Sequence, residues 1–288
     1  MSFFNDYSFF DDYCQTFSSF PTLFSDSCSL LDENNIYIAD NVYIADNVYI
    51  GTMQLGPSNP YQHYNLSLSN EEISDLDNLR VEKKDLLRIF GTLEGLESKI
   101  QSFIEGLSSK NANISSRIAH SITEQLSDIM AINKHSGDSL FVQLRAELPG
   151  ANLDRTHFTP DIHVDGIIEV EIINPQNKYL STEARYFFTI KGPSTLFFQT
   201  LSEDLRKEFI LHDMAFGDHS SFFENKLDMT DYNTAKFGQG TVFLSGMKNG
   251  AVHSAPLVDS ERLLVIVDVR SNERIKQLER IVSKEEDN

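Results

Sequence analysis

Apolar residues recur at helical spacing between residues 69 and 137. Ser69 or Asn70 suits a helix N-cap, and two apolar series follow at helical spacing, the second of them at steps of four and three. The first series is Ile73, Leu76, Leu79, Leu86, Leu87, Phe90, Leu93, Leu96, Ile100, Ile104 and Leu107. The second is Ile114, Ile118, Ile122, Leu126, Ile129 and Ile132. The pattern predicts a helical region over 69–137 that packs on the rest of the chain.

Residues 138–271 change to a pattern typical of β-strands. Short segments rich in β-branched and aromatic residues alternate with Pro, Gly and Asn signals. The segments are 140–148, 162–173, 185–190, 240–246, 250–256 and 262–269. Short strands with irregular links favour an antiparallel sandwich or barrel over a doubly wound sheet. One helix is expected within this part, at 202–214, and a C-terminal helix at 272–281, in the segment 272–288.

Two hexad repeats mark the first 68 residues. SFFNDY-SFFDDY, at 2–13, begins an aromatic arm, which we expect to pack on the main body. NIYIAD-NVYIAD-NVYIG, at 35–51, has an even period that keeps Ile and Val on one face of a strand and Tyr on the other. This repeat predicts one or two strands, with a turn at Asp40-Asn41 or Asp46-Asn47.

Composition and charge narrow the class of protein. The 288 residues are 40% hydrophobic and carry a net charge of −19. A field of this sign repels nucleic acids and anionic membranes. Cys14 and Cys28 are too few for a disulfide scaffold, and no signal peptide or run of ~18 apolar residues is visible. A cytoplasmic protein is expected, and a homodimer is compatible with the sequence.

A His-x-Asp motif holds the main chemical signal. His163 and Asp165 lie in a predicted strand, where alternation puts both side chains on the same side. His253, in GAVHSAP, would complete a 2-His-1-carboxylate metal site. Because these residues are far apart, only a β fold that returns a late strand beside an early one unites them, as a double-stranded β-helix does. Arg262, at the head of an apolar strand, offers a fork for a carboxylate.

This order resembles the Fe(II)/2-oxoglutarate-dependent oxygenase superfamily. The resemblance implies an α+β protein with a double-stranded β-helix core, the jelly roll of the cupins, and an N-terminal helical layer. It further implies that His163, Asp165 and His253 bind Fe(II), that Arg262 pairs with the distal carboxylate of 2-oxoglutarate, and that O2 is a co-reactant.

A closer similarity covers roughly residues 140–270. The blocks HVDG, RYFFTIKGPSTLFF, GAVHSAP and ERLLVIVD resemble an uncharacterised bacterial family with H-x-D, R-x-x-x-T-x-x-GP-x-T, H-R-S-P-P and R-L-L. Here His253 is followed by Ser-Ala-Pro, so the Arg of that family motif is absent. Arg185 is a candidate anion contact, and Tyr186 and Thr189 are candidate hydrogen-bond partners of the cosubstrate.

Each of these residues also has a structural reading. His163 with Asp165 can form a hydrogen-bonded strand pair, His253 can be a satisfied core residue, and Arg262 can pair with Glu261, Asp259 or Asp268. His157, His212 and His219 compete as metal ligands. Pro160 separates His157 from the His163 strand, and we expect His212 and His219 on the solvated surface. The sequence has no G-x-S-x-G, P-loop or G-x-G-x-x-G.

These observations predict an oxygenase that oxidises a C–H bond of a small molecule, an amino acid or a peptide. Two alternatives stay open at this point. The first is a cupin-like iron enzyme that does not use 2-oxoglutarate, in which Arg262 binds the substrate's own carboxylate. The second is a non-enzymatic jelly-roll binding or assembly protein, which the aromatic arm and the repeats favour.

Overall fold

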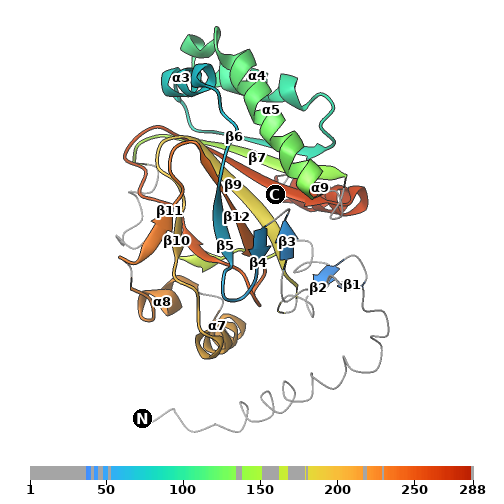
Figure 1. Cartoon of the computed structure of the whole chain (residues 1–288), viewed down its shortest axis with the longest axis vertical. Coiled ribbons are helices and arrows are strands. Elements are labelled where there is room, and N and C mark those ends of the chain that lie inside the picture. Colours follow the sequence, from blue (N-terminus) through green and yellow to red (C-terminus); the bar gives the residue numbers. More distant parts are fainter. Residues whose placement is uncertain are drawn as a thin grey trace. The chain divides into compact units, whose positions relative to one another are not determined.

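The computed structural model of the chain combines antiparallel sheets with helices (Figure 1). It describes residues 37–39, 42–44, 48–50, 53–133, 138–150, 162–167, 179, 181–216, 219–228 and 230–286. The aromatic arm, both cysteines and His157 lie outside the described residues.

The larger sheet has six antiparallel strands. In spatial order these are β5 (Tyr61–Asn65), β12 (Gln239–Ser245), β9 (Glu183–Lys191), β14 (Arg262–Arg270), β7 (Ser139–Glu147) and β6 (Asp85–Gly91). The central strand β14 is buried along its whole length, which explains its nearly continuous apolar sequence. The strands predicted at 140–148, 185–190, 240–246 and 262–269 are confirmed within one or two residues at each end.

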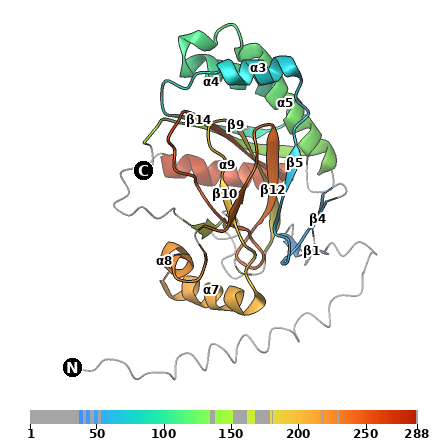
Figure 2. The same cartoon turned by 60° about the vertical axis from the view of Figure 1, so that its left-hand side comes forward.

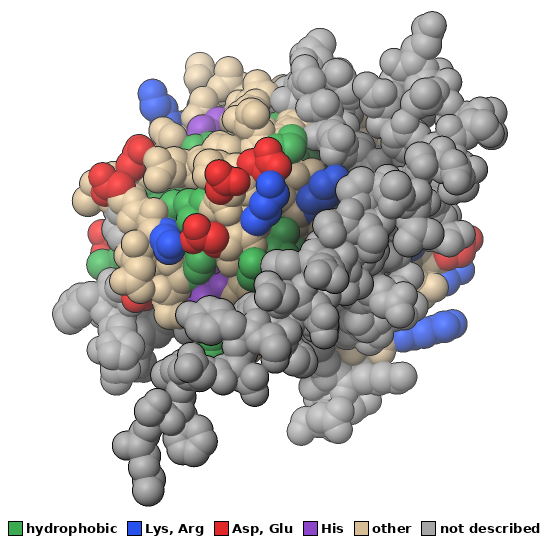
Figure 3. Space-filling model, turned by 90° about the horizontal axis from the view of Figure 1, so that it is seen from below, with side chains coloured by type: hydrophobic (Ala, Val, Ile, Leu, Met, Phe, Trp, Pro, Cys, Tyr) green, Lys and Arg blue, Asp and Glu red, His purple; other side chains and the backbone are tan. Residues whose placement is uncertain are grey.

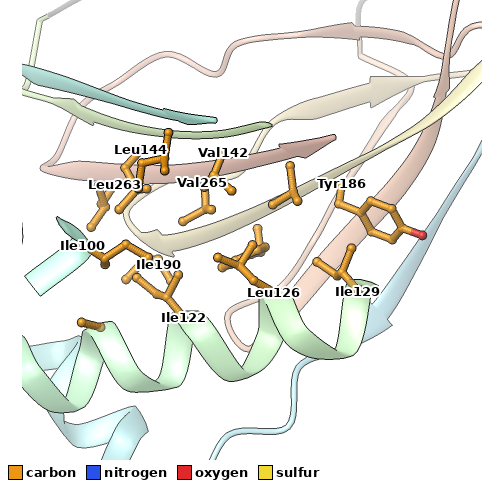
Figure 4. Close-up of a cluster of buried hydrophobic side chains, with 14 of the residues drawn as sticks. Ile100, Ile122, Leu126, Ile129, Val142, Leu144, Tyr186, Ile190, Leu263 and Val265 are labelled. Atoms are coloured by element: carbon orange, nitrogen blue, oxygen red, sulfur yellow. The ribbon is translucent and has the colours of Figure 1, made fainter. Parts of the chain in front are cut away.

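One face of this sheet packs against α3 (Asn70–Asn78), α4 (Leu96–Leu107) and α5 (Ser115–Ile132). Ser69 caps α3, accepting a hydrogen bond from the Glu72 amide, while the Glu72 side chain accepts from the Ser69 amide. Figure 4 shows the apolar stripe of α5 facing the sheet. Its labelled residues are Ile122, Leu126 and Ile129, opposite Val142, Leu144, Tyr186, Ile190, Leu263 and Val265. The predicted helical layer is confirmed for these three helices.

The helical prediction is wrong for Asp85–Gly91. This segment is β6, which pairs with β7 along its length. Leu87 and Ile89 alternate toward the helices, a period of two that the neighbouring Leu86 and Phe90 disguised as helical spacing. The strands β5, β10 and β11 were not predicted either.

A second sheet of four antiparallel strands lies on the face of the larger sheet that is turned away from α3, α4 and α5. Its order is β11 (Tyr232–Thr234), β10 (Leu196–Phe198), β13 (Val252–Ser254) and β8 (His163–Val164). A buried cluster joins the two sheets: Phe187, Phe243, Leu264 and Ile266 from the larger sheet with Phe197 and Ala251. We call the sheet face that holds this cluster the inner face.

Three further α-helices are described, and a short 3-10 helix, η1 (Ser109–Asn111), follows α4. The helix α7 (Glu203–Phe216) confirms the prediction at 202–214, and it lies with α8 (His219–Glu224) on the opposite side of the strands from α3–α5 (Figures 1 and 2). The C-terminal helix α9 (Asn272–Glu286) packs Ile275, Leu278 and Val282 on Phe141 of β7. Seen from the side of α7 and α8, acidic and basic side chains lie next to one another on the surface (Figure 3).

The second hexad repeat does form strands. The strands β1 (Tyr37–Ala39) and β2 (Val42–Ile44) pair antiparallel, with Ala39 opposite Val42. The strand β3 (Val48–Ile50) pairs with β4 (Met53–Leu55). None of the described helices combines the length and the apolar character that crossing a membrane requires.

Candidate metal centre

Two neighbouring strands bring His163, Asp165 and His253 together. The strand β8 pairs antiparallel with β13, and His163 stands directly opposite His253. The ring centroids are 4.5 Å apart. One ligand atom from each of the three residues lies within 4.8 Å of the others, and this is the one such group of His, Cys, Asp or Glu among the described residues.

A single carboxylate oxygen faces both imidazoles. Asp165 Oδ1 lies 3.5 Å from His163 Nε2 and 3.6 Å from His253 Nε2. Metal bonds of about 2.1 Å separate adjacent ligand atoms by roughly 3 Å. Shifts of a few tenths of an ångström therefore suffice to bind one ion, and this donor set suits iron.

The His253 ring is fixed in one orientation and one tautomer. Its Nδ1 lies 3.0 Å from the Ala251 carbonyl oxygen, which can only accept, so Nδ1 carries the proton. The lone pair is then on Nε2, toward Asp165. Phe197 stacks on the ring at 5.6 Å, and Phe187 and Phe243 contact its edges. His253 is 2% exposed, so these rings keep water from one side of the site.

Asp165 is held in its ionised form. Burial alone would raise the pKa of this carboxyl. Its interactions with His253, Arg185 and His163 hold the pKa well below its usual value, and Arg185 is the permanently charged partner among them. The second oxygen, Oδ2, accepts a hydrogen bond of 2.7 Å from Arg185 Nη1. One oxygen is thus positioned by Arg185, and the other is directed at the histidines.

Arg185 is engaged by protein carboxylates on both sides. Its Nε donates to Asp268 Oδ1 at 2.9 Å, in addition to the bond to Asp165. Burial lowers the pKa of Arg185, but the carboxylates of Asp268 and Asp165 raise it by a larger amount. The pKa is therefore above its ordinary value, and the guanidinium stays charged. Both carboxylates are side chains of the protein, so Arg185 has no contact with an external anion in this structure. It orients Asp165, the candidate metal ligand.

Arg262 lies on the inner side of β14 and is 2% exposed. Its Nη1 donates to Glu147 Oε2 at 2.7 Å, and the two residues are opposite each other in the sheet. Its Nε donates to the Pro193 carbonyl at 2.9 Å and its Nη2 to Thr195 Oγ1 at 3.2 Å. Two residues of the GP-x-T block, Pro193 and Thr195, thus accept hydrogen bonds from Arg262. Its ionic partner is Glu147, and not Glu261, Asp259 or Asp268 as the sequence suggested.

Tyr186 and Thr189 lie on opposite faces of β9. Tyr186 belongs to the core beneath the helices, and its hydroxyl accepts a hydrogen bond of 2.5 Å from Asn133 Nδ2. The structure does not bring Tyr186 to the metal centre. Thr189 is on the inner face, like Arg185 and Phe187, and is 9% exposed.

The expectation of a solvated surface is wrong for His219. Its Nε2 lies 2.6 Å from Oδ1 of the buried Asp213, which also accepts a hydrogen bond from the Tyr179 hydroxyl. His212 packs against Phe216 and Phe222 at ring distances of 4.9 and 5.2 Å. Neither histidine belongs to the group that can hold a metal.

Two residues of the inner face were not among the site residues predicted from the sequence. His63, on β5, lies with Nδ1 2.8 Å from Thr241 Oγ1 and packs against Phe197. Arg145, on β7, shares the face of Gln143 and Glu147. A charged residue among the apolar residues of a strand was the signal available for Arg145.

The chain matches no family model and no curated protein. Solved structures that it resembles include a viral collagen prolyl hydroxylase from Paramecium bursaria Chlorella virus-1, with 13% identity over 74% of this chain and 90% of that chain, and a TM-score of 0.35. A prolyl-4-hydroxylase of Pseudomonas putida shares 11% identity over 74% and 92%, with a TM-score of 0.34. The dioxygenase for auxin oxidation of Arabidopsis thaliana shares 9% over 74% and 83%, with a TM-score of 0.35. These likenesses are too low to identify a function.

Proposed function

We propose that the chain is a non-haem Fe(II)/2-oxoglutarate-dependent oxygenase with a double-stranded β-helix core. The observation that carries the proposal is the cluster of two imidazoles and one carboxylate from β8, β13 and the residue after β8, with ligand atoms within 4.8 Å. His163, Asp165 and His253 are the proposed ligands. Bound iron with 2-oxoglutarate and O2 supplies the oxidising power for a C–H bond.

The surroundings of the three residues support an iron site. The Ala251 carbonyl directs the lone pair of His253 inward, and Arg185 keeps Asp165 charged and oriented. His163 is 34% exposed, whereas His253 is almost fully buried. A substrate therefore approaches from the His163 side, while the phenylalanines exclude water behind His253.

We assign the distal carboxylate of 2-oxoglutarate to Arg262. A buried guanidinium with the Thr195 hydroxyl 3.2 Å from Nη2 offers donors for one carboxylate group. Thr189, on the inner face, is assigned as a further polar contact of the cosubstrate. The ion pair with Glu147 opposes this binding, so the Glu147 carboxylate has to move away or be protonated when 2-oxoglutarate enters.

That ion pair also favours a second candidate, an iron enzyme of the same fold that does not use 2-oxoglutarate. An Arg262 that stays neutralised by Glu147 has no charge to offer a dianionic cosubstrate. The substrate of either enzyme is proposed to be a small molecule, an amino acid or a peptide.

Anaerobic titration of the full chain with Fe(II) and then 2-oxoglutarate tests the proposal. We expect a weak visible charge-transfer band with the wild type and none with His163→Ala or Asp165→Ala. His120→Ala, an exposed histidine on α5, is the matched control and should keep the band. Iron binding without a 2-oxoglutarate band favours the second candidate, and iron content that is equal in all variants contradicts both.

A further inference from the structure

Arg145 stands in the row of residues that crosses the inner face beside the metal centre. It is opposite Leu264 of β14, which is opposite Thr189 of β9. Leu264 belongs to the buried cluster between the two sheets, the same cluster whose phenylalanines contact His253. Residues directly opposite one another in antiparallel strands point to the same side. The Arg145 side chain therefore starts from the surface that faces the metal centre.

Arg145, Arg185 and Arg262, three of the arginines on this face, differ in their partners. Arg185 and Arg262 are both bound to protein carboxylates and are largely buried. Arg145 is exposed to solvent, and its hydrogen bonds go to a neutral group, Gln143 Oε1, at 3.1 Å from Nε and 2.9 Å from Nη2. Its Nη1 has no hydrogen bond or ion pair in the described part of the chain.

The contact with Gln143 leaves one side of the guanidinium ready for an anion. A guanidinium has five N–H donors, arranged so that two neighbouring nitrogens can bind both oxygens of a carboxylate. The Gln143 oxygen occupies the pair made by Nε and Nη2. The pair made by Nη1 and the second hydrogen of Nη2 stays available, and Gln143 fixes the plane in which it points.

Electrostatics link Arg145 to the metal centre. Part of the Arg145 side chain is exposed, but the protein packed around the guanidinium partly desolvates it and lowers its pKa, while the carboxylates of Asp165 and Glu147 raise it. Asp165 is the proposed carboxylate ligand of the metal, and its negative charge acts on the Arg145 guanidinium. In a chain of net charge −19, a solvent-accessible cation at this position draws anions to the site.

We propose that Arg145, oriented by Gln143, binds a carboxylate of the molecule that is oxidised at the metal centre. The inference rests on the proposed function, in which Arg262 takes the distal carboxylate of 2-oxoglutarate. It narrows the substrate class to carboxylic acids, with the oxidised C–H bond held over His163 and Asp165 while the acid group reaches Arg145. Arg145 is then a specificity residue and does not bind the cosubstrate.

Binding of small acids to the full chain loaded with Zn(II) and 2-oxoglutarate tests the proposal without turnover. The probes are a panel of N-acetyl amino acids and the matching primary amides, followed by ligand-observed NMR. We expect acids of the panel to bind and their amides not to. Arg145→Gln should weaken acid binding by ~10- to 100-fold, because a hydrogen bond to a charged group contributes about 1.5–3 kcal/mol. Arg145→Lys should restore part of the binding.

A second measurement separates this proposal from the assignment of the site. The dissociation constant of 2-oxoglutarate should be the same in Arg145→Gln as in the wild type and in the control Arg280→Gln, which removes an exposed arginine of α9. If Arg145→Gln weakens 2-oxoglutarate binding as Arg262→Gln does, Arg145 is a cosubstrate residue and the proposal is wrong. Equal binding of acids and amides, or no binding by either, also overturns it. Loss of 2-oxoglutarate binding in every protein instead refutes the proposed function.

Discussion

Arg185 Nη1 lies 2.7 Å from Asp165 Oδ2, which makes Asp165 the first member of a chain of buried ion pairs. The chain continues from Arg185 to Asp268, from Asp268 to Arg270 at 3.2 Å, and from Arg270 to Glu183 at 2.6 Å. Glu183 also accepts a hydrogen bond from Arg274 of α9. Each charge in this series has an opposite neighbour, as burial requires. The candidate metal ligand is thereby connected through the larger sheet to the C-terminal helix.

Replacement of Arg185 should affect both metal affinity and stability. Arg185→Gln leaves Asp165 without its orienting donor, and loss of such a partner typically lowers metal affinity by ~10- to 100-fold. It also leaves Asp268 and Asp165 less compensated, which should cost about 3–5 kcal/mol of unfolding free energy. Calorimetric titration with Mn(II) and urea unfolding measure the two effects. Arg280→Gln, on the exposed side of α9, serves as control.

A purely structural role for Arg185 would appear as a different pattern. The stability would fall, but the metal affinity of the folded variant would equal that of the wild type. Arg185→Lys makes the distinction sharper, because an ammonium retains the charge but cannot bridge Asp165 and Asp268 with a rigid fork. We expect it to bind metal with an affinity between those of the wild type and Arg185→Gln.

Glu147→Gln should strengthen the binding of 2-oxoglutarate. The Glu147 carboxylate lies 2.7 Å from Arg262 and competes with the cosubstrate for the same guanidinium. Removing its charge should lower the dissociation constant at least about threefold, which corresponds to roughly 0.7 kcal/mol at 1.4 kcal/mol per factor of ten. The charge-transfer band at graded 2-oxoglutarate concentrations gives the constant. Unchanged or weaker binding in this variant would contradict the assignment of Arg262 to the cosubstrate.

Tyr186→Phe should act on stability alone. The Tyr186 hydroxyl is buried and accepts a hydrogen bond from Asn133, so its removal leaves an amide donor unsatisfied. A loss of about 1–3 kcal/mol in unfolding free energy is expected. Iron and 2-oxoglutarate titrations of the same variant should match the wild type, because the residue faces α5 and not the metal centre. An altered 2-oxoglutarate affinity would restore the sequence-based role of Tyr186.

The buried strands were predictable because their composition repeats over whole segments. RLLVIVDV and RYFFTI are too rich in β-branched and aromatic residues to suit helices, and both are central strands of the larger sheet. The segment DLLRIFG was not, since its apolar residues fit both periods and only pairing with β7 decides between them. The strand YQHYN at β5 carries no apolar alternation at all.

The candidate site divides in the same way. The structure brings His163, Asp165 and His253 together, as predicted. The H-x-D motif is visible in the sequence, and the pairing of β13 with β8 follows from the order of strands in the expected β fold. That they bind metal stays a prediction. The partners of the arginines depend on strand register, which has no local signal: Glu147 is 115 residues from Arg262 in sequence and directly opposite it in the sheet. Asp268, which the sequence offered to Arg262, is bound to Arg185 instead.

The pH dependence of stability should reveal His63. Burial lowers the pKa of this imidazole below its ordinary value of 6.5, and its Nε2 has no hydrogen-bond partner in the described part of the structure. The unfolded chain therefore binds a proton at a higher pH than the folded chain does. By linkage, the stability from a neutral His63 is complete above about pH 6.5 and is lost as the pH falls through the folded pKa.

The matched variant is His63→Gln, which does not titrate and can still hydrogen-bond Thr241. The unfolding free energies of both proteins are measured with urea at pH 7.5 and pH 5.5. Because both proteins contain the same other histidines, the contributions of those residues cancel when the two pH-dependent changes are compared. The wild type should lose more stability than the variant between these two values. Equal losses would mean that His63 is as easily protonated in the folded chain as in the unfolded one. Water or an anion would then have to reach the imidazolium, and the inner face would be open at this end as well as at His163.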